Sequence, residues 1–304
     1  MLVAGAICPH PPLLIPAAMG AAGLDGGGPA DAGLDGAGPA DAKLRGVRAS
    51  CAAAVAGLLA AGPDLLVVVG GAARGAVYAG HAAGSLRDFG ITVAVGSGEP
   101  VLPLSLTVGA WLLDQAGEAR AAGRAGEGRA AGRAGEARAA GQAGTEHPAG
   151  RALRAHPAGQ PGTGPARCAL PCRLLLRAVP TDMPPANCLR LGAELAGLAP
   201  RVALLAMGDA SARKAVGVHG VADPAADCYD AEAAAALAAA DTGRLARLDP
   251  ALDDELMIAG RAAWQVLAGA ADGAALRGRL RCAVAPYDVS YLVASWQNSA
   301  AAPA

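Results

Sequence analysis

Three short polar segments could carry chemistry, because each directly follows an apolar run that predicts a buried strand. They are Cys8–His10 after residues 2–8, Gly70–Arg74 after residues 64–70, and Gly208–Arg213 after residues 201–207. Ligands of layered α/β proteins bind beyond the carboxyl ends of the strands. His10 stands between prolines, which fix the backbone around it and leave the imidazole few rotamers, as a metal ligand requires. These segments are therefore the candidate functional site.

The elements that must position these segments alternate along the chain. Apolar runs predict strands at 2–8, 64–70, 91–95, 172–179, 201–207 and, as a pair or one strand with a turn near Pro286, 281–296. Helical patterns cover 43–61, 104–115, 186–198, 225–240 and 250–271. This alternation predicts an α/β fold, with a layered mixed or mostly parallel sheet covered by helices on both faces.

Two low-complexity segments interrupt the pattern. Residues 22–41 hold a ten-residue sequence, AGLDGGGPAD, that is repeated almost unchanged, and residues 117–167 repeat RAAGRAGEG and its variants with a period of nine. Glycine weakens each helical turn, and the apolar residues are nearly all alanine, so neither segment can bury a continuous core. We interpret both as flexible insertions within a single α/β domain that spans residues 1–304.

Composition excludes several classes of protein. The 304 residues have a net charge of −1, which argues against a nucleic-acid binder and a polybasic membrane-surface protein. With 53% hydrophobic and 17% charged residues, the chain can build a core. No apolar run is long enough to predict a signal peptide or a membrane span. The seven scattered cysteines form no disulfide framework, so we expect a reduced, soluble, cytoplasmic protein.

Five blocks of sequence carry a resemblance to a known family: VAGAICPHPPLLIP, GPDLLVVVGG, ALLAMGDASAR, DPAADCYDAEAAAALAAADTGRLARLDP and APYDVSYLVASW. In this order they resemble the class III extradiol ring-cleavage dioxygenases, and more narrowly the family of the catalytic B subunit of protocatechuate 4,5-dioxygenase (LigB-like), which includes the Memo proteins. The resemblance implies the extradiol dioxygenase type of α/β fold and a catechol-like substrate. It also implies a non-haem Fe(II) cofactor held by two histidines and one carboxylate, with a further histidine as acid/base.

The implied site is incomplete in this chain. His10 occupies the position of the first metal histidine, but the second falls at Ala72 and the acid/base histidine at Ala212. The carboxylate position falls at residues 258–259, which are Ile and Ala. One of the four expected groups is therefore present.

Other polar residues nearby are candidates for the missing roles. Asp209 and Ser211 match the motif that ends at the acid/base position, and we expect them to line the cleft. His81 and Glu255 are candidate substitutes that would form a relocated Fe(II) triad with His10, if the loop carrying His81 folds back. Metal geometry is strict, so a lost site is the simpler interpretation.

Two functional hypotheses follow. The first is an iron-dependent ring-cleaving oxidoreductase that acts on a small aromatic substrate with a rearranged site. The second is a non-catalytic relative whose cleft binds a small molecule or a protein partner. Both predict no nucleic acid and no membrane as partners.

Overall fold

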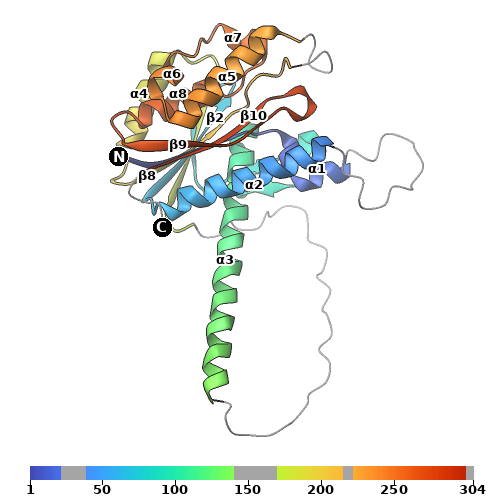
Figure 1. Ribbon diagram of the computed structural model, residues 1–304, viewed down its shortest axis with the longest axis vertical. Coiled ribbons are helices and arrows are strands. Elements are labelled where there is room, and N and C mark those ends of the chain that lie inside the picture. The colour runs from blue at the N-terminus through green and yellow to red at the C-terminus, as the bar shows by residue number, and fades with distance from the viewer. Residues whose placement is uncertain (22–38, 140–169, 215–221, 299–304) are drawn as a thin grey trace, which may run out of the picture.

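The computed structural model describes residues 1–21, 39–139, 170–214 and 222–298 (Figure 1). Within these ranges one seven-stranded sheet has the order β3-β7-β2-β8-β1-β10-β9. Its strands are β1 (Leu2–Cys8), β2 (Leu65–Ala72), β3 (Ala76–Ala79), β7 (Arg173–Pro180), β8 (Val202–Met207), β9 (Leu276–Val284) and β10 (Tyr291–Asn298). A small second sheet comprises β4 (Ala82–Ser85), β5 (Ala94–Val95) and β6 (Ser97–Pro100).

The central strands run parallel. β2 pairs in parallel with β7 and β8, and β8 pairs in parallel with β1. β1 and β8 are buried along their whole length, as expected for strands covered on both faces. The outer strands β3, β9 and β10 pair antiparallel. The sheet is therefore mixed, and the prediction of an α/β fold is confirmed.

Helices cover both faces of the sheet (Figure 1). One hydrophobic cluster joins α2 (Pro39–Ala60) and α3 (Leu104–Ala139) to alternate residues of the strands, and a second joins α4 (Pro185–Ala196), α5 (Pro224–Ala239) and α8 (Arg261–Ala270) to the others. The shorter helices are α1 (Pro16–Ala21), α6 (Thr242–Ala246) and α7 (Leu252–Leu256), with 3-10 turns at Pro12–Leu14, Arg87–Phe89 and Pro286–Asp288. Among the described residues, no helix combines the length and apolarity that crossing a membrane requires.

The predicted helix 250–271 is wrong as one element, because the chain forms α7 and α8 with a break between them. Met257 adopts a left-handed backbone with φ of 53°, which no helix continues. The break brings Gly260 against the end of β8: a Cβ on Gly208 would lie 2.2 Å from the Gly260 Cα. Packing of the chain against the strand end therefore overrides the helical pattern.

The insertion predicted at 117–167 is also wrong in part, because α3 continues through residue 139. No proline occurs between residues 104 and 139, and alanine, arginine and glutamate favour helix strongly enough to offset glycine, which costs about 1 kcal/mol per residue. The end of α3 extends away from the sheet (Figure 1). Residues 39–41 of the other predicted insertion belong to α2. Residues 22–38 and 140–167 lie outside the described residues.

Candidate functional site

The three polar segments singled out by the sequence meet at one edge of the sheet. In the parallel register Cys8 pairs with Met207, and Met207 pairs with Gly70. The residues that follow each strand are therefore neighbours at the carboxyl edge. This is the edge at which open α/β sheets bind ligands.

His10 and Asp209 form the polar centre of this edge. The backbone N–H of His10 donates to Asp209 Oδ1 at 2.8 Å, and His10 Nδ1 lies 3.7 Å from the same oxygen. His10 is 8% exposed, and its Nδ1 is buried without a hydrogen-bond partner. A separation of 3.7 Å is too long for a hydrogen bond, but a small rotation of the ring would close it. The pair thus has the arrangement in which a carboxylate orients an imidazole.

Tyr291, at the start of β10, was not identified from the sequence. Its side chain is almost fully buried near Asp209. Burial raises the pKa of the phenol above its usual range, and the negative charge of Asp209 raises it further. Tyr291 is therefore a neutral phenol beside the carboxylate. A signal for it existed in the block APYDVSYLVASW, in which the strand begins at this tyrosine.

The prediction that Ser211 lines a cleft is wrong, because this residue is fully buried. Its N–H and Oγ donate to the two carboxylate oxygens of Asp230, at 3.0 and 2.7 Å. The Ser290 hydroxyl also donates to Asp230, and Lys214 Nζ lies 3.1 Å from it. This network ties the loop after β8 to α5 and β10. Ser211 therefore holds the loop that carries Asp209, whose own side chain remains partly exposed.

His81 lies at the wrong end of the sheet to join His10. Strand β3 runs antiparallel to β7, so that Ala79 pairs with Leu175 near the start of β7. His81 follows two residues later, exposed, near the amino ends of the parallel strands. The loop that the relocated triad required to fold back instead leads into β4. His81 is thus excluded from a site with His10.

Glu255 lies in α7 with an exposed side chain, and the Arg213 guanidinium is bonded to its backbone carbonyl at 3.2 Å. The positions that the resemblance assigns to the missing groups lie closer to Asp209. The Ala259 N–H donates to the Asp209 carbonyl at 3.2 Å, and the Ala212 N–H donates to the Leu256 carbonyl at 2.9 Å. Ala212 and Ala259 carry methyl groups at positions where the resemblance implies an imidazole and a carboxylate.

The donor set does not fit a ferrous ion. Fe(II) in a facial triad needs three protein ligands that converge on one point. His10 has Asp209 beside it, but His81 is at the other edge, and in the described part of the chain no three His, Cys, Asp or Glu side chains are grouped to hold a metal. We therefore assign no chemical step to iron.

A pocket of about 310 Å³ adjoins the site. It is lined by Thr181, Asp182, Pro250, Asp253, Asp254, Met257, Ile258 and Ala259. Ala259 connects it to Asp209 through the backbone hydrogen bond described above. The lining combines three carboxylates and a hydroxyl with the apolar side chains of proline, methionine and isoleucine. Such a pocket suits a compact ligand with an apolar body and hydrogen-bond donors.

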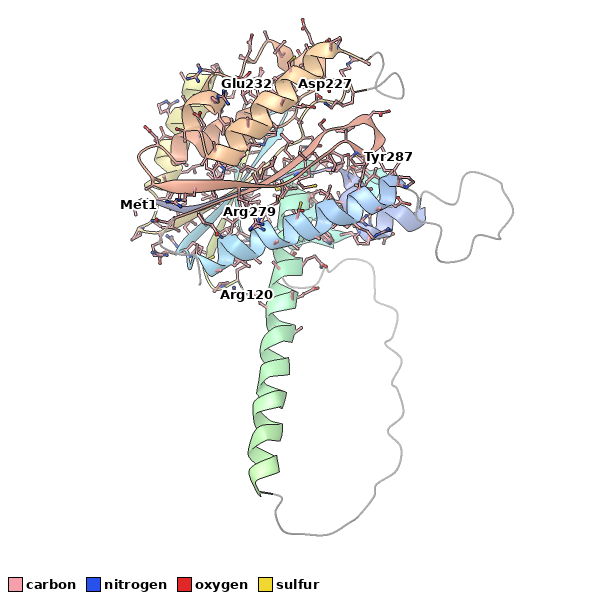
Figure 2. The ribbon with its side chains drawn as sticks, in the orientation of Figure 1. Met1, Arg120, Asp227, Glu232, Arg279 and Tyr287 are labelled. Atoms are coloured by element: carbon pink, nitrogen blue, oxygen red, sulfur yellow. The ribbon has the colours of Figure 1, made fainter. Side chains whose placement is uncertain are left out.

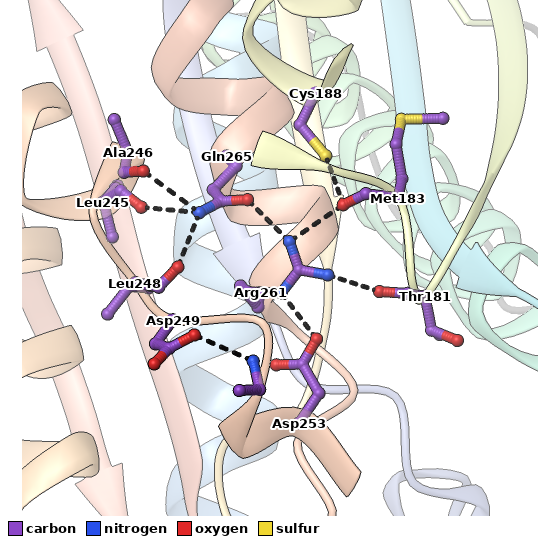
Figure 3. Close-up of polar contacts among 11 residues, drawn as sticks. Thr181, Met183, Cys188, Leu245, Ala246, Leu248, Asp249, Asp253, Arg261 and Gln265 are labelled. Atoms are coloured by element: carbon purple, nitrogen blue, oxygen red, sulfur yellow. Dashed lines mark hydrogen bonds and ion pairs between the residues drawn. The ribbon is translucent and has the colours of Figure 1, made fainter. Parts of the chain in front are cut away.

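Arg261, the first residue of α8, is bonded to two residues of the pocket lining, Asp253 and Thr181; Figure 3 shows these contacts. It is 1% exposed; its Nε pairs with Asp253 at 2.5 Å, and its two terminal nitrogens donate to the carbonyls of Met183 and Thr181 at 3.0 and 2.7 Å. Gln265 accepts a further bond from Arg261 at 2.7 Å. Burial raises the pKa of Asp253, although the arginine opposes this shift. The guanidinium is therefore bonded on several sides, whereas the second carboxylate oxygen of Asp253, Oδ1, is buried without a hydrogen-bond partner.

Comparison with known proteins identifies no family. No protein-family model matches the chain, and no curated protein matches it. Among solved structures the chain is similar to the crystal structure of uncharacterized protein JW3007 from Escherichia coli K12, with 13% sequence identity and a TM-score of 0.42. The match covers 96% of this chain and 99% of that chain. It names no activity.

Proposed function

We propose that this protein is a non-catalytic relative of the extradiol dioxygenases that binds a small aromatic molecule carrying hydroxyl groups. The observation that carries the proposal is the pocket at the carboxyl edge, next to a polar centre at which the described residues provide no group of three metal-ligating side chains. The resemblance of the sequence blocks supports the aromatic class of ligand. The apolar side chains accommodate a ring, and the carboxylates accept hydrogen bonds from its hydroxyl groups.

The test is binding of simple uncharged catechols to the full chain in buffer that contains a chelator, measured by calorimetry and thermal shift. We expect binding without iron, because no step of recognition depends on a metal. Asp254→Arg replaces a carboxylate that accepts hydrogen bonds from the catechol hydroxyl groups by a donor, and should weaken binding about tenfold. The matched control is Asp272→Arg, an exposed residue after α8 that lines no part of the pocket. Equal affinity in both variants would contradict the pocket as the site.

The second candidate is the iron-dependent ring-cleaving oxidoreductase with a rearranged site. One observation favours it: His10 is held at the carboxyl edge with its Nδ1 unbonded. The discriminating measurement is iron content after anaerobic loading with Fe(II). We expect far less than one iron per chain and no cleavage of protocatechuate. Stoichiometric iron that is lost when His10 is changed together with His81 or Glu255 would establish the relocated triad instead.

A further inference from the structure

Strand β9 forms an open, arginine-bearing edge of the large sheet. Among the described strands it pairs with β10 alone. Its sequence, LRGRLRCAV, contains three arginines at alternate positions: Arg277, Arg279 and Arg281. The outer row of β9 backbone groups is thus unpaired by any described strand, and an edge of this kind is a template for a further strand.

All three arginines lie on the face that α2 covers. Arg277 pairs with Gln297, whose side chain reaches Gly57 of α2, and Arg279 pairs with Ser295. Arg281 lies where the register shifts, and its Nε donates to Ser295 Oγ at 2.8 Å. The register therefore places Arg277 and Arg279 on one face, and the hydrogen bond to Ser295 brings Arg281 beside them. Figure 2 shows Arg279 beside α2. Alternate residues of a strand are about 7 Å apart, so this row of arginines has the repeat of a neighbouring strand.

The charges of this row are not neutralised by the described part of the chain. Arg277 and Arg279 are exposed, and neither has an ion pair there. The helix that packs over this face, α2, has a single acidic residue, Asp41, and its carboxylate accepts a hydrogen bond from Tyr287 at 3.0 Å. The mutual repulsion of neighbouring arginines contributes, after burial, to lowering the pKa of Arg281. The positive charges of Arg277 and Arg279 are therefore available to pair with carboxylates of a partner.

We infer that the β9 edge is a docking site for an acidic, extended segment of another protein, which adds to the sheet as a further strand. Backbone hydrogen bonds supply the pairing, and Glu or Asp side chains at alternate positions of the partner meet the arginines across the strands. A second copy of this chain is disfavoured, because pairing of two β9 edges would place arginines opposite arginines. This inference concerns the opposite side of the sheet from the pocket and does not depend on the proposed function.

The first test uses a fluorescein-labelled nine-residue peptide of alternating Thr and Glu, with a Thr–Lys peptide for comparison. We expect the full chain to bind the Glu peptide and not the Lys peptide. Charge reversal in Arg277→Glu/Arg279→Glu should weaken Glu-peptide binding at least about tenfold and create binding of the Lys peptide. The control Arg87→Glu/Arg173→Glu makes the same change of charge at exposed residues away from β9 and should leave Glu-peptide binding unchanged.

A second test separates strand addition from plain charge attraction. Two versions of the Glu peptide are N-methylated at alternate residues, so that each removes the N–H groups of one edge. Strand addition uses one edge, so one version should lose binding and the other keep it. Equal binding of both versions, or equal competition by polyglutamate, would overturn the inference. The inference would also be overturned if the chain binds no Glu peptide and the variant Arg277→Val/Arg279→Val self-associates. The arginines would then only protect the edge from pairing with another copy.

Discussion

Arg261 is the single residue on which the candidate site depends most for its shape. The guanidinium is buried, its partner Asp253 is mostly buried at the pocket wall, and the guanidinium also holds the turn after β7 through the Thr181 and Met183 carbonyls. Removing one member of such a pair leaves the charge of the other member without compensation. The energetic cost of substitution therefore comes mainly from the partner that stays behind.

We expect Arg261→Met to lower the free energy of unfolding by about 3–5 kcal/mol, measured by urea denaturation. Arg261→Met/Asp253→Leu should recover part of this loss, because neither charge is then left alone. The control is Arg190→Met, which breaks an exposed pair with Glu194 and should cost less than about 0.5 kcal/mol. Additive losses in the double variant would show that Arg261 and Asp253 act independently.

Residue by residue, the sequence located the site better than it assigned roles. His10 and Asp209 were predictable because each directly follows a strand whose apolar run marks its end. Ser211 was misassigned because its partner Asp230 lies in a distant helix, and nothing local reveals that contact. His81 was misplaced because β3 reverses direction after Ala72, and a four-residue strand leaves little periodicity to detect.

At the scale of elements, the contact between Gly208 and Gly260 sets how closely α8 approaches the end of β8. We expect Gly208→Ala to destabilise the fold by about 1–3 kcal/mol, because the new methyl group meets backbone that cannot rotate away. Gly46→Ala is the matched control. Its Cβ would have no atom within 4 Å and it lies inside α2, so it should stabilise by about 0.5–1 kcal/mol. Thermal unfolding of both variants measures the difference, and a neutral Gly208→Ala would contradict the close contact.

The first part of helix α3 packs against the sheet, and its end extends away from the sheet (Figure 1). Leu106 and Leu113 are fully buried in the first part. Deleting residues 117–167 and joining the flanks by a short Gly/Ser linker should leave the unfolding of the core cooperative, since loop-closure free energy changes by only roughly 0.6 kcal/mol per doubling of length. Leu113→Ala, in contrast, should cost about 2–5 kcal/mol. Loss of cooperative unfolding in the deletion variant would show that the repeat is structural.

The elements that the sequence predicted correctly are those with strong apolar periodicity, such as β1, β2, β8 and α4. The break between α7 and α8 escaped prediction, because Met257 carries no local signal for a left-handed backbone. The continuation of α3 to residue 139 was also not predicted, because the glycines in every repeat were given more weight than the helix-favouring alanines and arginines. Tertiary contacts and helix propensity decided these two cases against the local pattern.

At the scale of the whole molecule, the parallel core brings the ends of β1, β2 and β8 together whatever their side chains are. The iron site that the sequence resemblance implies should therefore be partly restorable. Ala72→His/Ala212→His supplies a second ligand and an acid/base group, and should gain some metal with little cleavage of protocatechuate. Adding Ala259→Glu supplies the carboxylate and should raise the iron content further.

The measurement is iron per chain after anaerobic loading, by elemental analysis. His10→Ala in the triple variant should remove the bound iron again, because the remaining ligands are too few. A triple variant that gains no iron would show that the three strand ends and the break before α8 do not converge as closely as the fold indicates.

The contact between Gly208 and Gly260 constrains which residues can replace Gly208 during evolution. A side chain at position 208 would meet the backbone of Gly260, whereas a side chain at position 260 would meet the ring of Trp264. A mutation at position 208 would therefore be selected against until the segment before α8 moved outward. Any such movement would shift Ala259 and widen the neighbouring pocket. We therefore expect homologous chains that replace Gly208 to carry a displaced segment before α8 and to have diverged in the molecule they bind.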